Sequence, residues 1–253
     1  MPNPQLTFYD LGEGVTAFST TRHGGCSIGN YGEFNINNYC GDDASHIAEN
    51  RRSLAALLGI EDRHIVMPHQ VHGVEVRRID GPQQEVIEGV DAVMTDVPQL
   101  CIGVSTADCI PIIIYDPLHH AACAIHAGWR GTVQRIAQAA VEAMSKTYDS
   151  DPSQMKAVIG PGISLESFEV GEEVYQQFAD AGFDMAKIAR MYAKWHIDLP
   201  LCNRLQLEGM GVNDIYMSGI CTYQQHDDYF SARRLGINSG RIFTGVMMRK
   251  SDS

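Results

Sequence analysis

The chain has 253 residues and a mass of 27.9 kDa, a length that one large α/β domain commonly reaches. Hydrophobic residues make up 44% and charged residues 20%, which is typical of a globular protein and not of a disordered one. The net charge of −12 argues against a nucleic-acid binder, because displacing counterions from phosphates requires a basic face. An anionic substrate would therefore have to be bound by a few local arginines.

Nothing in the sequence directs the chain to a membrane or out of the cell. Residues 1–15 contain neither the basic segment nor the apolar segment of a secretory signal peptide. No stretch approaches the roughly 18 uninterrupted apolar residues of a membrane span. The seven cysteines are an odd number without a framework spacing, which favours reduced thiols. We therefore expect a cytoplasmic protein that does not bind membranes.

Four segments show the apolar spacing of helices. The first is capped by Ser45 and stopped by Gly59, and the second follows Thr132. The predicted helices cover residues 47–58, 133–144, 172–180 and 199–210. Residues 22–43 are rich in glycine, asparagine and aspartate instead, and this pattern predicts a long ordered loop or a pair of hairpins.

Short apolar or alternating runs predict strands between these helices. They cover residues 65–69, 74–79, 92–95, 100–105, 110–115, 121–125, 157–160, 215–218 and 242–248. Three of these runs, CIGVS, IPIIIY and AACAIHA, are almost continuously apolar, as in sheets covered on both faces. Because several strands follow one another through tight turns and no linker divides the chain, we expect a single α+β domain over residues 1–253. Its mixed sheets would pack together with helices on their outer faces.

Three segments place a residue that can bind a metal where an apolar strand meets a turn. They are MPHQVHGVEV with His72, STADCIPIIIYDP with Cys109, and AIHAGWRGT with His126. Two imidazoles and a thiolate suit Zn²⁺, and three protein ligands would leave a fourth position open to substrate. However, the spacing matches no standard metal motif, and a single histidine or cysteine at a strand end is more often a packed residue. From pattern alone, the metal site and the packed interpretation both stay open.

Longer motifs add a resemblance to a known family. HQVHG, TADCIP, HAGWRGT, IGPGIS with FEVG, DLPLCNRLQL, and YFSARR followed by GR occur in the order seen in the YfiH family, between Arg22 and Arg241. The chain thus resembles this family, which is also called laccase-domain or polyphenol-oxidase-like. The resemblance implies packed mixed β-sheets flanked by helices, and a zinc ion, or copper, held by His72, Cys109 and His126.

The resemblance also implies an activity. Family members are associated with phosphorolysis of purine nucleosides, which makes them pentosyltransferases, and with deamination of adenosine. The expected partners are adenosine, inosine, guanosine or methylthioadenosine, together with phosphate, and the expected state is a monomer or a small homo-oligomer. Copper-dependent phenol oxidation was the earlier label for the family.

Three further residues are candidates for such chemistry. Arg22 in the glycine-rich segment and Arg130 at the start of a helix could bind substrate phosphate through the planar fork of the guanidinium. Asp108 precedes Cys109 and could act as a general acid or base. The alternatives are a solvent-facing or ion-paired arginine in each case, and an aspartate that hydrogen-bonds its own turn.

Three other functions remain open. Cys109 and His126 could be the nucleophile and base of a metal-free hydrolase or deamidase, with Asp108 or His72 as third member. A copper-dependent polyphenol oxidase is disfavoured, because its oxygen-reducing cluster commonly uses HxH pairs, and the ten histidines here include none. An editing role in cell-wall precursor metabolism has been suggested for relatives, but no residue here argues for it.

Overall fold

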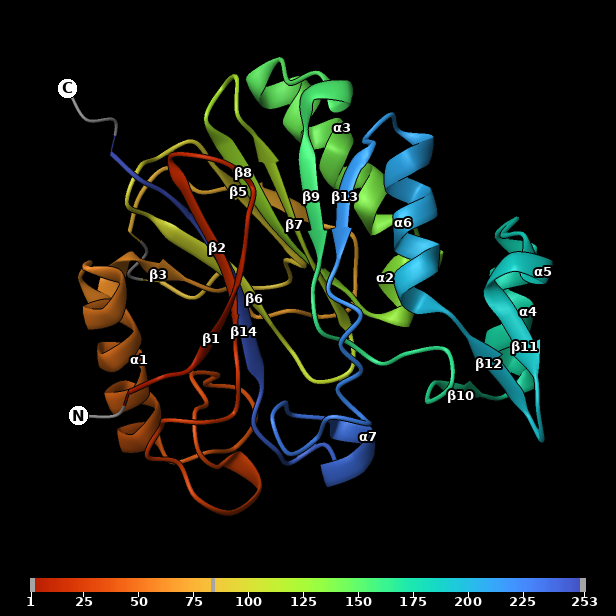
Figure 1. Cartoon of the computed structure of the whole chain (residues 1–253), viewed down its shortest axis with the longest axis horizontal. Coiled ribbons are helices and arrows are strands. Elements are labelled where there is room, and N and C mark those ends of the chain that lie inside the picture. The colour runs from red at the N-terminus through yellow and green to blue at the C-terminus, as the bar shows by residue number, and fades with distance from the viewer. Residues whose placement is uncertain (1–2, 83–84, 251–253) are drawn as a thin grey trace.

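The computed structural model of the chain describes residues 3–82 and 85–250, which form two β-sheets packed face to face between helices (Figure 1). The first sheet has the order β1 (Leu6–Tyr9), β2 (Val15–Thr20), β14 (Ile242–Met248), β6 (Cys101–Thr106), β3 (Ile65–Val66). The second has the order β13 (Asp214–Met217), β9 (Lys156–Ile159), β7 (Ile110–Asp116), β8 (Ala121–Ala127), β5 (Ala92–Thr95), β4 (Val76–Arg78). Both sheets contain parallel and antiparallel pairs, so the predicted α+β fold with mixed sheets is confirmed.

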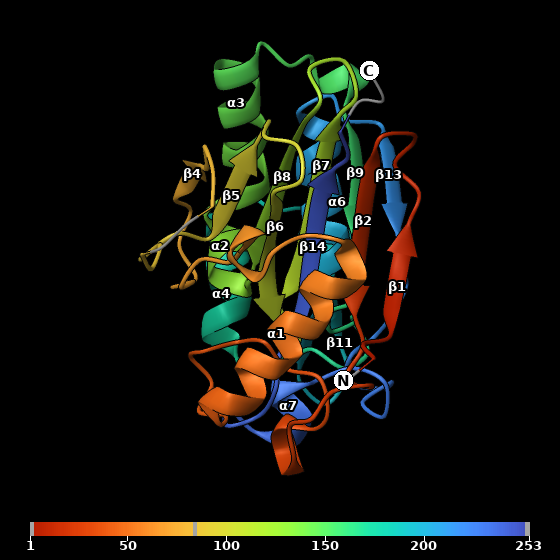
Figure 2. The same ribbon diagram turned by 90° about the vertical axis from the view of Figure 1, so that its left-hand side faces the viewer.

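The molecule is built in four layers, which Figure 2 shows from the side. Helix α1 (Ala44–Leu58) packs on the outer face of the five-stranded sheet. Helices α2 (Trp129–Val133), α3 (Ile136–Tyr148) and α6 (Leu199–Gly209) cover the outer face of the six-stranded sheet. Side chains alternate along β7, where Ile112 faces the helices and Ile113 faces the other sheet. Every residue of β6, β7 and β8 is therefore buried, as their apolar sequences predicted.

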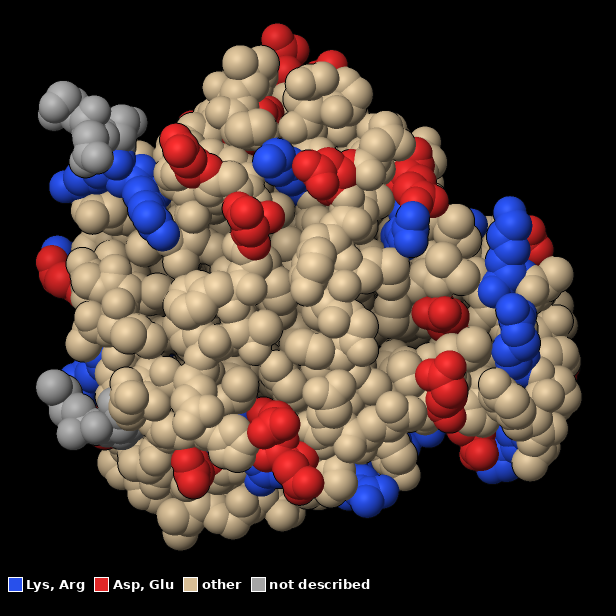
Figure 3. Space-filling model, viewed as in Figure 1, with Lys and Arg blue, Asp and Glu red and all other residues tan. Residues whose placement is uncertain are grey.

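A smaller unit projects from the edge of these layers. It is a three-stranded sheet with the order β10 (Glu169–Val170), β12 (Trp195–Ile197), β11 (Ala189–Met191), covered by α4 (Glu172–Asp180) and α5 (Met185–Ile188). Figure 3 shows a column of basic side chains over this unit with acidic groups beside it, while charged groups of both signs are scattered over the rest of this face. No helix of the described residues is long and apolar enough to cross a membrane.

Several element boundaries differ from the sequence prediction. Asp43, and not Ser45, caps α1, because its carboxylate accepts the backbone N–H of Ser45. The helix predicted over residues 133–144 is α3, which begins only at Ile136; α2 before it was not predicted, and Arg135, in a left-handed conformation with φ of 68°, separates the two. The prediction also missed two elements of the first sheet, β1 and β2, and all of the projecting sheet together with α5 and the short helix α7 (Ala232–Leu235).

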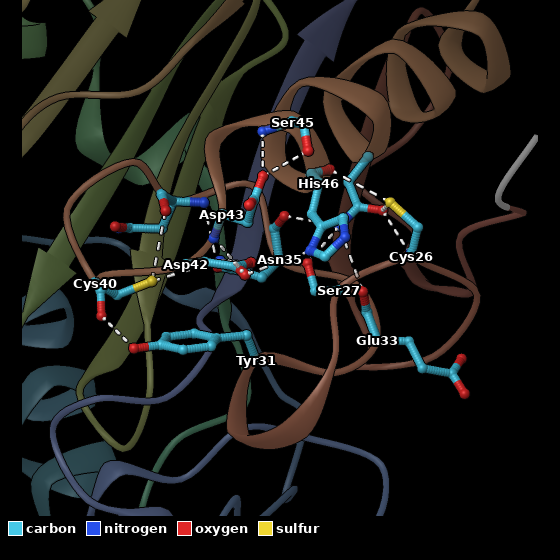
Figure 4. A network of polar contacts seen from close by, with 12 residues as sticks. Cys26, Ser27, Tyr31, Glu33, Asn35, Cys40, Asp42, Asp43, Ser45 and His46 are labelled. Atoms are coloured by element: carbon cyan, nitrogen blue, oxygen red, sulfur yellow. Dashed lines mark hydrogen bonds and ion pairs between the residues drawn. The ribbon is translucent and has the colours of Figure 1, made fainter.

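The glycine-rich segment from residue 22 to 43 is an ordered loop and contains one 3₁₀ turn, Gly29–Tyr31, but no pair of hairpins. Buried polar side chains hold it against α1 (Figure 4). Asn50 of α1 accepts the N–H of Cys26 at 3.0 Å and donates to the carbonyl of Asn35 at 2.9 Å. Asp42 accepts from Ser27 and Asn35 at 2.7 and 2.9 Å. These hydrogen bonds take the place of the backbone hydrogen bonds that paired strands would make, and they fix the path of the loop.

Two glycines create the space for one aromatic ring in the first sheet. Gly103 of β6 is paired with Gly245 of β14, and the ring of Phe243 lies against both. A Cβ at residue 103 would overlap that ring and lie 2.7 Å from the carbonyl oxygen of Thr244. This close packing requires glycine for its small size, not for its backbone freedom.

We therefore expect Gly103→Ala to lower the free energy of unfolding by about 1–3 kcal/mol, because the ring of Phe243 must leave its place. Gly209→Ala is the matched control, since a Cβ there meets no atom within 4 Å and alanine favours a helix. Denaturant unfolding of both variants measures the difference. Equal stability of the two variants would contradict the packing argument.

Candidate metal centre

The three predicted ligands come together at one end of the second sheet. His72 lies in the turn between β3 and β4, Cys109 directly precedes β7, and His126 lies near the end of β8. Their donor atoms all lie within 4.8 Å of one another, and Cys109 Sγ is 3.8 Å from His72 Nε2. Among the described residues, no other group of three histidine, cysteine or acidic side chains is placed to hold a metal.

Strand pairing explains the convergence. β7 and β8 are antiparallel neighbours in which Ile110 pairs with Ala127, so Cys109 and His126 lie at the same end of the sheet. His126 is buried, Cys109 is half-buried and His72 is exposed, so the cluster is closed toward the core and accessible from outside. This gradient suits a site that must admit a substrate.

Asp91, which sequence reasoning missed, holds two of the three ligand residues in place, His126 through its side chain and His72 through its backbone. Its fully buried carboxylate accepts Nδ1–H of His126 at 2.8 Å. The same carboxylate accepts the consecutive backbone N–H groups of Val71, His72 and Gly73 at 3.2, 2.8 and 2.8 Å. Because Nδ1 of His126 is occupied, Nε2 is the nitrogen left to bind a metal. The same carboxylate holds the left-handed backbone of His72, which has φ of 63°.

Gly128 leaves room for the three ligands to approach. A Cβ on this residue would lie 2.7 Å from Cδ2 of His72, 3.1 Å from Sγ of Cys109 and 3.6 Å from Cε1 of His126. Any larger residue would therefore overlap His72 and crowd Cys109, while the distance to His126 is ordinary van der Waals contact. The first glycine of HAGWRGT, Gly128, is thus required because the ligand cluster lies so close to it.

The cluster sets the charges of its own members. Burial opposes ionisation of Cys109, but the imidazoles of His126 and His72 outweigh it and lower the pKa of the thiol to about 6. Burial likewise opposes charge on His126, but the Cys109 thiolate and Asp91 outweigh it and raise its pKa to about 9. In the metal-free protein at neutral pH, a thiolate therefore lies beside an imidazolium.

These residues fit a zinc ion. One sulfur and two nitrogen donors are a usual zinc set, and tetrahedral zinc would separate a sulfur and a nitrogen ligand by about 3.6 Å. The 3.8 Å between Cys109 Sγ and His72 Nε2 is close to that separation. The hydrogen bond from His126 to Asp91 supplies the carboxylate partner that ligating histidines commonly have.

A cavity of about 340 Å³ opens above the cluster. Its volume lies in the range of small-molecule sites. Its wall includes side chains from the glycine-rich loop, from the segment before His72, from β6 and from the C-terminal part of the chain, among them Asn37, Tyr39, His69, Gln70, Thr106 and Arg241. From the sequence, His69 was considered as a residue supporting the ligands, with a surface histidine the favoured interpretation, and the other five were not proposed.

Asp108 lies next to the cluster but is bound elsewhere. Its carboxylate accepts the hydroxyl of Thr222 at 2.8 Å and the backbone N–H of Arg233 at 2.6 Å, so it does not bond its own turn. Its backbone has φ of 87°, and its carbonyl accepts the N–H of Ile163 at 2.9 Å. Through these bonds Asp108, the residue directly before Cys109, is attached to α7.

The two predicted phosphate ligands are not in the cavity wall. The guanidinium of Arg22 donates to the carbonyls of Gly32 at 2.9 Å and His226 at 2.7 Å, and so binds the glycine-rich loop. Arg130 is exposed two residues after Gly128, and its guanidinium lies 4.3 Å from the ring centre of Trp129. The structure therefore brings the three proposed metal ligands together but gives the arginines other surroundings.

Comparison with known proteins shows a likeness over nearly the whole chain. Residues 16–249 match the family model described as multi-copper polyphenol oxidoreductase laccase. The chain is 44% identical over 249 residues to a purine nucleoside phosphorylase of Bacteroides thetaiotaomicron, covering 93% of this chain and 92% of that protein. It is 42% identical over 255 residues to an adenosine deaminase of an unknown prokaryotic organism, covering 96% and 97%. Its fold matches the crystal structure of a hypothetical protein YfiH of Bacillus licheniformis, with a TM-score of 0.92, 26% identity and 97% of each chain covered.

The role of Asp91 can be tested by removing its charge. Asp91→Asn is expected to lower zinc affinity by about 10- to 100-fold, because it removes the negative charge beside His126 and replaces one of the two accepting oxygens with an NH₂ group that faces N–H donors. Competition with a chromogenic chelator measures the affinity, and Asp96→Asn, at a half-exposed carboxylate, is the control. Unchanged affinity in a folded Asp91→Asn protein would refute the orienting role.

The charge state of the cluster predicts proton release. At pH 7.5, above the pKa of Cys109 at about 6 and below that of His126 at about 9, the metal-free cluster holds a thiolate and an imidazolium. Zinc requires the neutral imidazole, so binding should release close to one proton from His126. Calorimetry in buffers of different ionisation enthalpy counts the protons. Release of two would mean that the thiol is still protonated, and release of none that His126 is already neutral.

Proposed function

The chain belongs to the YfiH family, and from that premise we propose that it is a zinc-dependent purine nucleoside enzyme. The proposed reactions are phosphorolysis of adenosine, inosine, guanosine and methylthioadenosine and deamination of adenosine. The observation that carries the proposal is the convergence of His72, Cys109 and His126 beneath an accessible cavity of about 340 Å³. The names of the relatives, a purine nucleoside phosphorylase and an adenosine deaminase, supply the substrate class.

The residues around the cavity have different proposed roles in binding the ion and positioning its ligands. His72, Cys109 and His126 would hold the ion, and Asp91 positions the two histidines. A bound zinc ion would supply Lewis-acid chemistry at that point.

The remaining predicted residues take proposed roles that follow their surroundings. Arg130 is the proposed phosphate partner, because its exposed guanidinium lies close in sequence to Gly128, which touches the ligand cluster. Arg22 is proposed to support the site indirectly, by holding the glycine-rich loop in place. The carboxylate of Asp108 already has two donors, which favours positioning of Cys109 and α7 over proton transfer.

One observation favours a second candidate function. Cys109, His126 and Asp91 are arranged as nucleophile, base and orienting acid, and the lowered pKa of Cys109 suits a thiolate nucleophile. A metal-free hydrolase or deamidase would use this arrangement. His72 favours zinc, because Asp91 already fills the place of the orienting acid, and the exposed imidazole of His72, 3.8 Å from the sulfur, is then a further nitrogen donor that such a triad does not need.

A multi-copper oxidase is less well supported. That chemistry needs several copper ions, and the described residues contain one cluster able to hold a metal. The family description therefore records a likeness and does not by itself assign the reaction.

Activity with adenosine tests the proposal directly. The zinc-loaded protein should release adenine when phosphate is present and form inosine and ammonia when it is absent, as followed by chromatography. Cys109→Ser or chelation should abolish both reactions, whereas Cys26→Ser, at a cysteine in the glycine-rich loop, should retain them.

Two outcomes would overturn the proposal. Failure to convert any purine nucleoside would remove the substrate class. Full activity of a metal-free protein that still requires Cys109 would replace zinc catalysis with the thiol mechanism.

A further inference from the structure

Two aromatic rings from distant parts of the sequence meet in the wall of the cavity. Tyr39 belongs to the glycine-rich loop, and His69 lies three residues before His72. The rings are stacked, with centres 4.0 Å apart and planes 17° from parallel. Both residues line the cavity, and the tyrosine is 39% exposed. The pair thus offers flat aromatic surface to whatever occupies the cavity.

Hydrogen bonds hold the ring of His69 and the backbone of Tyr39 in this arrangement. Nδ1 of His69 is 2.7 Å from a carboxylate oxygen of Glu88, and the backbone of His69 bridges the same segment through the carbonyl of Ile87 and the N–H of Gly89. The backbone N–H of Tyr39 donates to Oδ1 of Asn37 at 2.6 Å. The surface is therefore formed before a ligand arrives, and binding does not have to order it.

Two amide side chains of the cavity wall already have partners. Gln70 donates to the carbonyl of Ser105 at 2.8 Å and accepts the N–H of Ser105 at 2.8 Å. Asn37 donates to the hydroxyl of Ser105 at 2.6 Å. These amides brace the wall, and the aromatic pair beside them offers a flat surface to a ring system.

The pair is within reach of the metal cluster. His69 lies three positions before His72 in the sequence, and a three-position step spans at most about 11 Å. A ligand whose base lies on the rings can therefore extend toward His72, Cys109 and His126.

We propose that Tyr39 and His69 form the platform on which the purine base stacks, in the same cavity as the metal cluster. This inference rests on the proposed nucleoside function. Stacking depends on the area of the ring and little on its exocyclic groups. The platform thus accounts for acceptance of adenine, hypoxanthine and guanine nucleosides alike and favours purines over the smaller pyrimidines.

Steady-state kinetics of adenosine phosphorolysis test the platform. Tyr39→Leu removes the ring but keeps apolar volume, and it should raise KM for adenosine between about fivefold and about a hundredfold. Tyr39→Phe keeps the ring and should stay within about threefold of the parent protein. Tyr192→Leu, at an exposed tyrosine next to β11, is the matched control and should leave KM unchanged. KM for phosphate and zinc content should be unchanged in all three.

A second measurement does not depend on the leucine variant folding. In zinc-loaded protein with isotope-labelled tyrosine rings, adenosine should shift the Tyr39 signals, which Tyr39→Phe identifies by their absence. An unchanged KM in Tyr39→Leu, or Tyr39 signals that do not move at saturating adenosine, would overturn the platform while leaving the proposed function intact. Lack of turnover by the parent protein would instead contradict the proposed function itself.

Discussion

The candidate site depends on one buried carboxylate. Asp91 binds the side chain of His126 and the backbone of residues 71–73, so a single anion places two ligands that come from different parts of the chain. Burying a carboxylate without partners would cost several kcal/mol, and the four donors offset that cost. Burial raises the pKa of Asp91, but His126 and the N–H groups of Gly73 and Val71 outweigh it, so the carboxyl stays ionised. Gly128 then provides the space in which the ligands that Asp91 orients can meet.

The sequence predicted features that depend on local pattern. The strands at residues 92–95 and 242–248 have the predicted boundaries, because both are short buried segments in which apolar residues predominate. The three proposed ligands could be chosen because each stands at a strand end inside a distinctive motif. Strand β2 was missed because its apolar pattern is interrupted by polar residues that the sheet buries, such as Ser19 and Thr20.

What the sequence could not predict arises from long-range contact. Asp91 lies before a strand in GVDAVMT, a position where aspartate usually has no special role, and its task follows only from the pairing of β5 with β8. Arg22 suggested a phosphate ligand by its residue type, but the carbonyls of Gly32 and His226 lie within its reach in the folded loop. Tyr39 gave no signal at all, since an aromatic residue in a glycine-rich loop is common and its partner His69 is 30 positions away.

The contacts of Asp91 with backbone N–H groups also link metal binding to the folding of the whole chain. The cluster cannot assemble in part, because it needs the β5–β8 pairing, the turn at residues 71–73 and the start of β7 together. A metal that binds only this assembled state shifts the folding equilibrium toward the folded protein. The added stability grows with the logarithm of the free metal concentration. The amount of native protein in a cell would then follow the supply of the ion, so that metal limitation lowers abundance as well as activity.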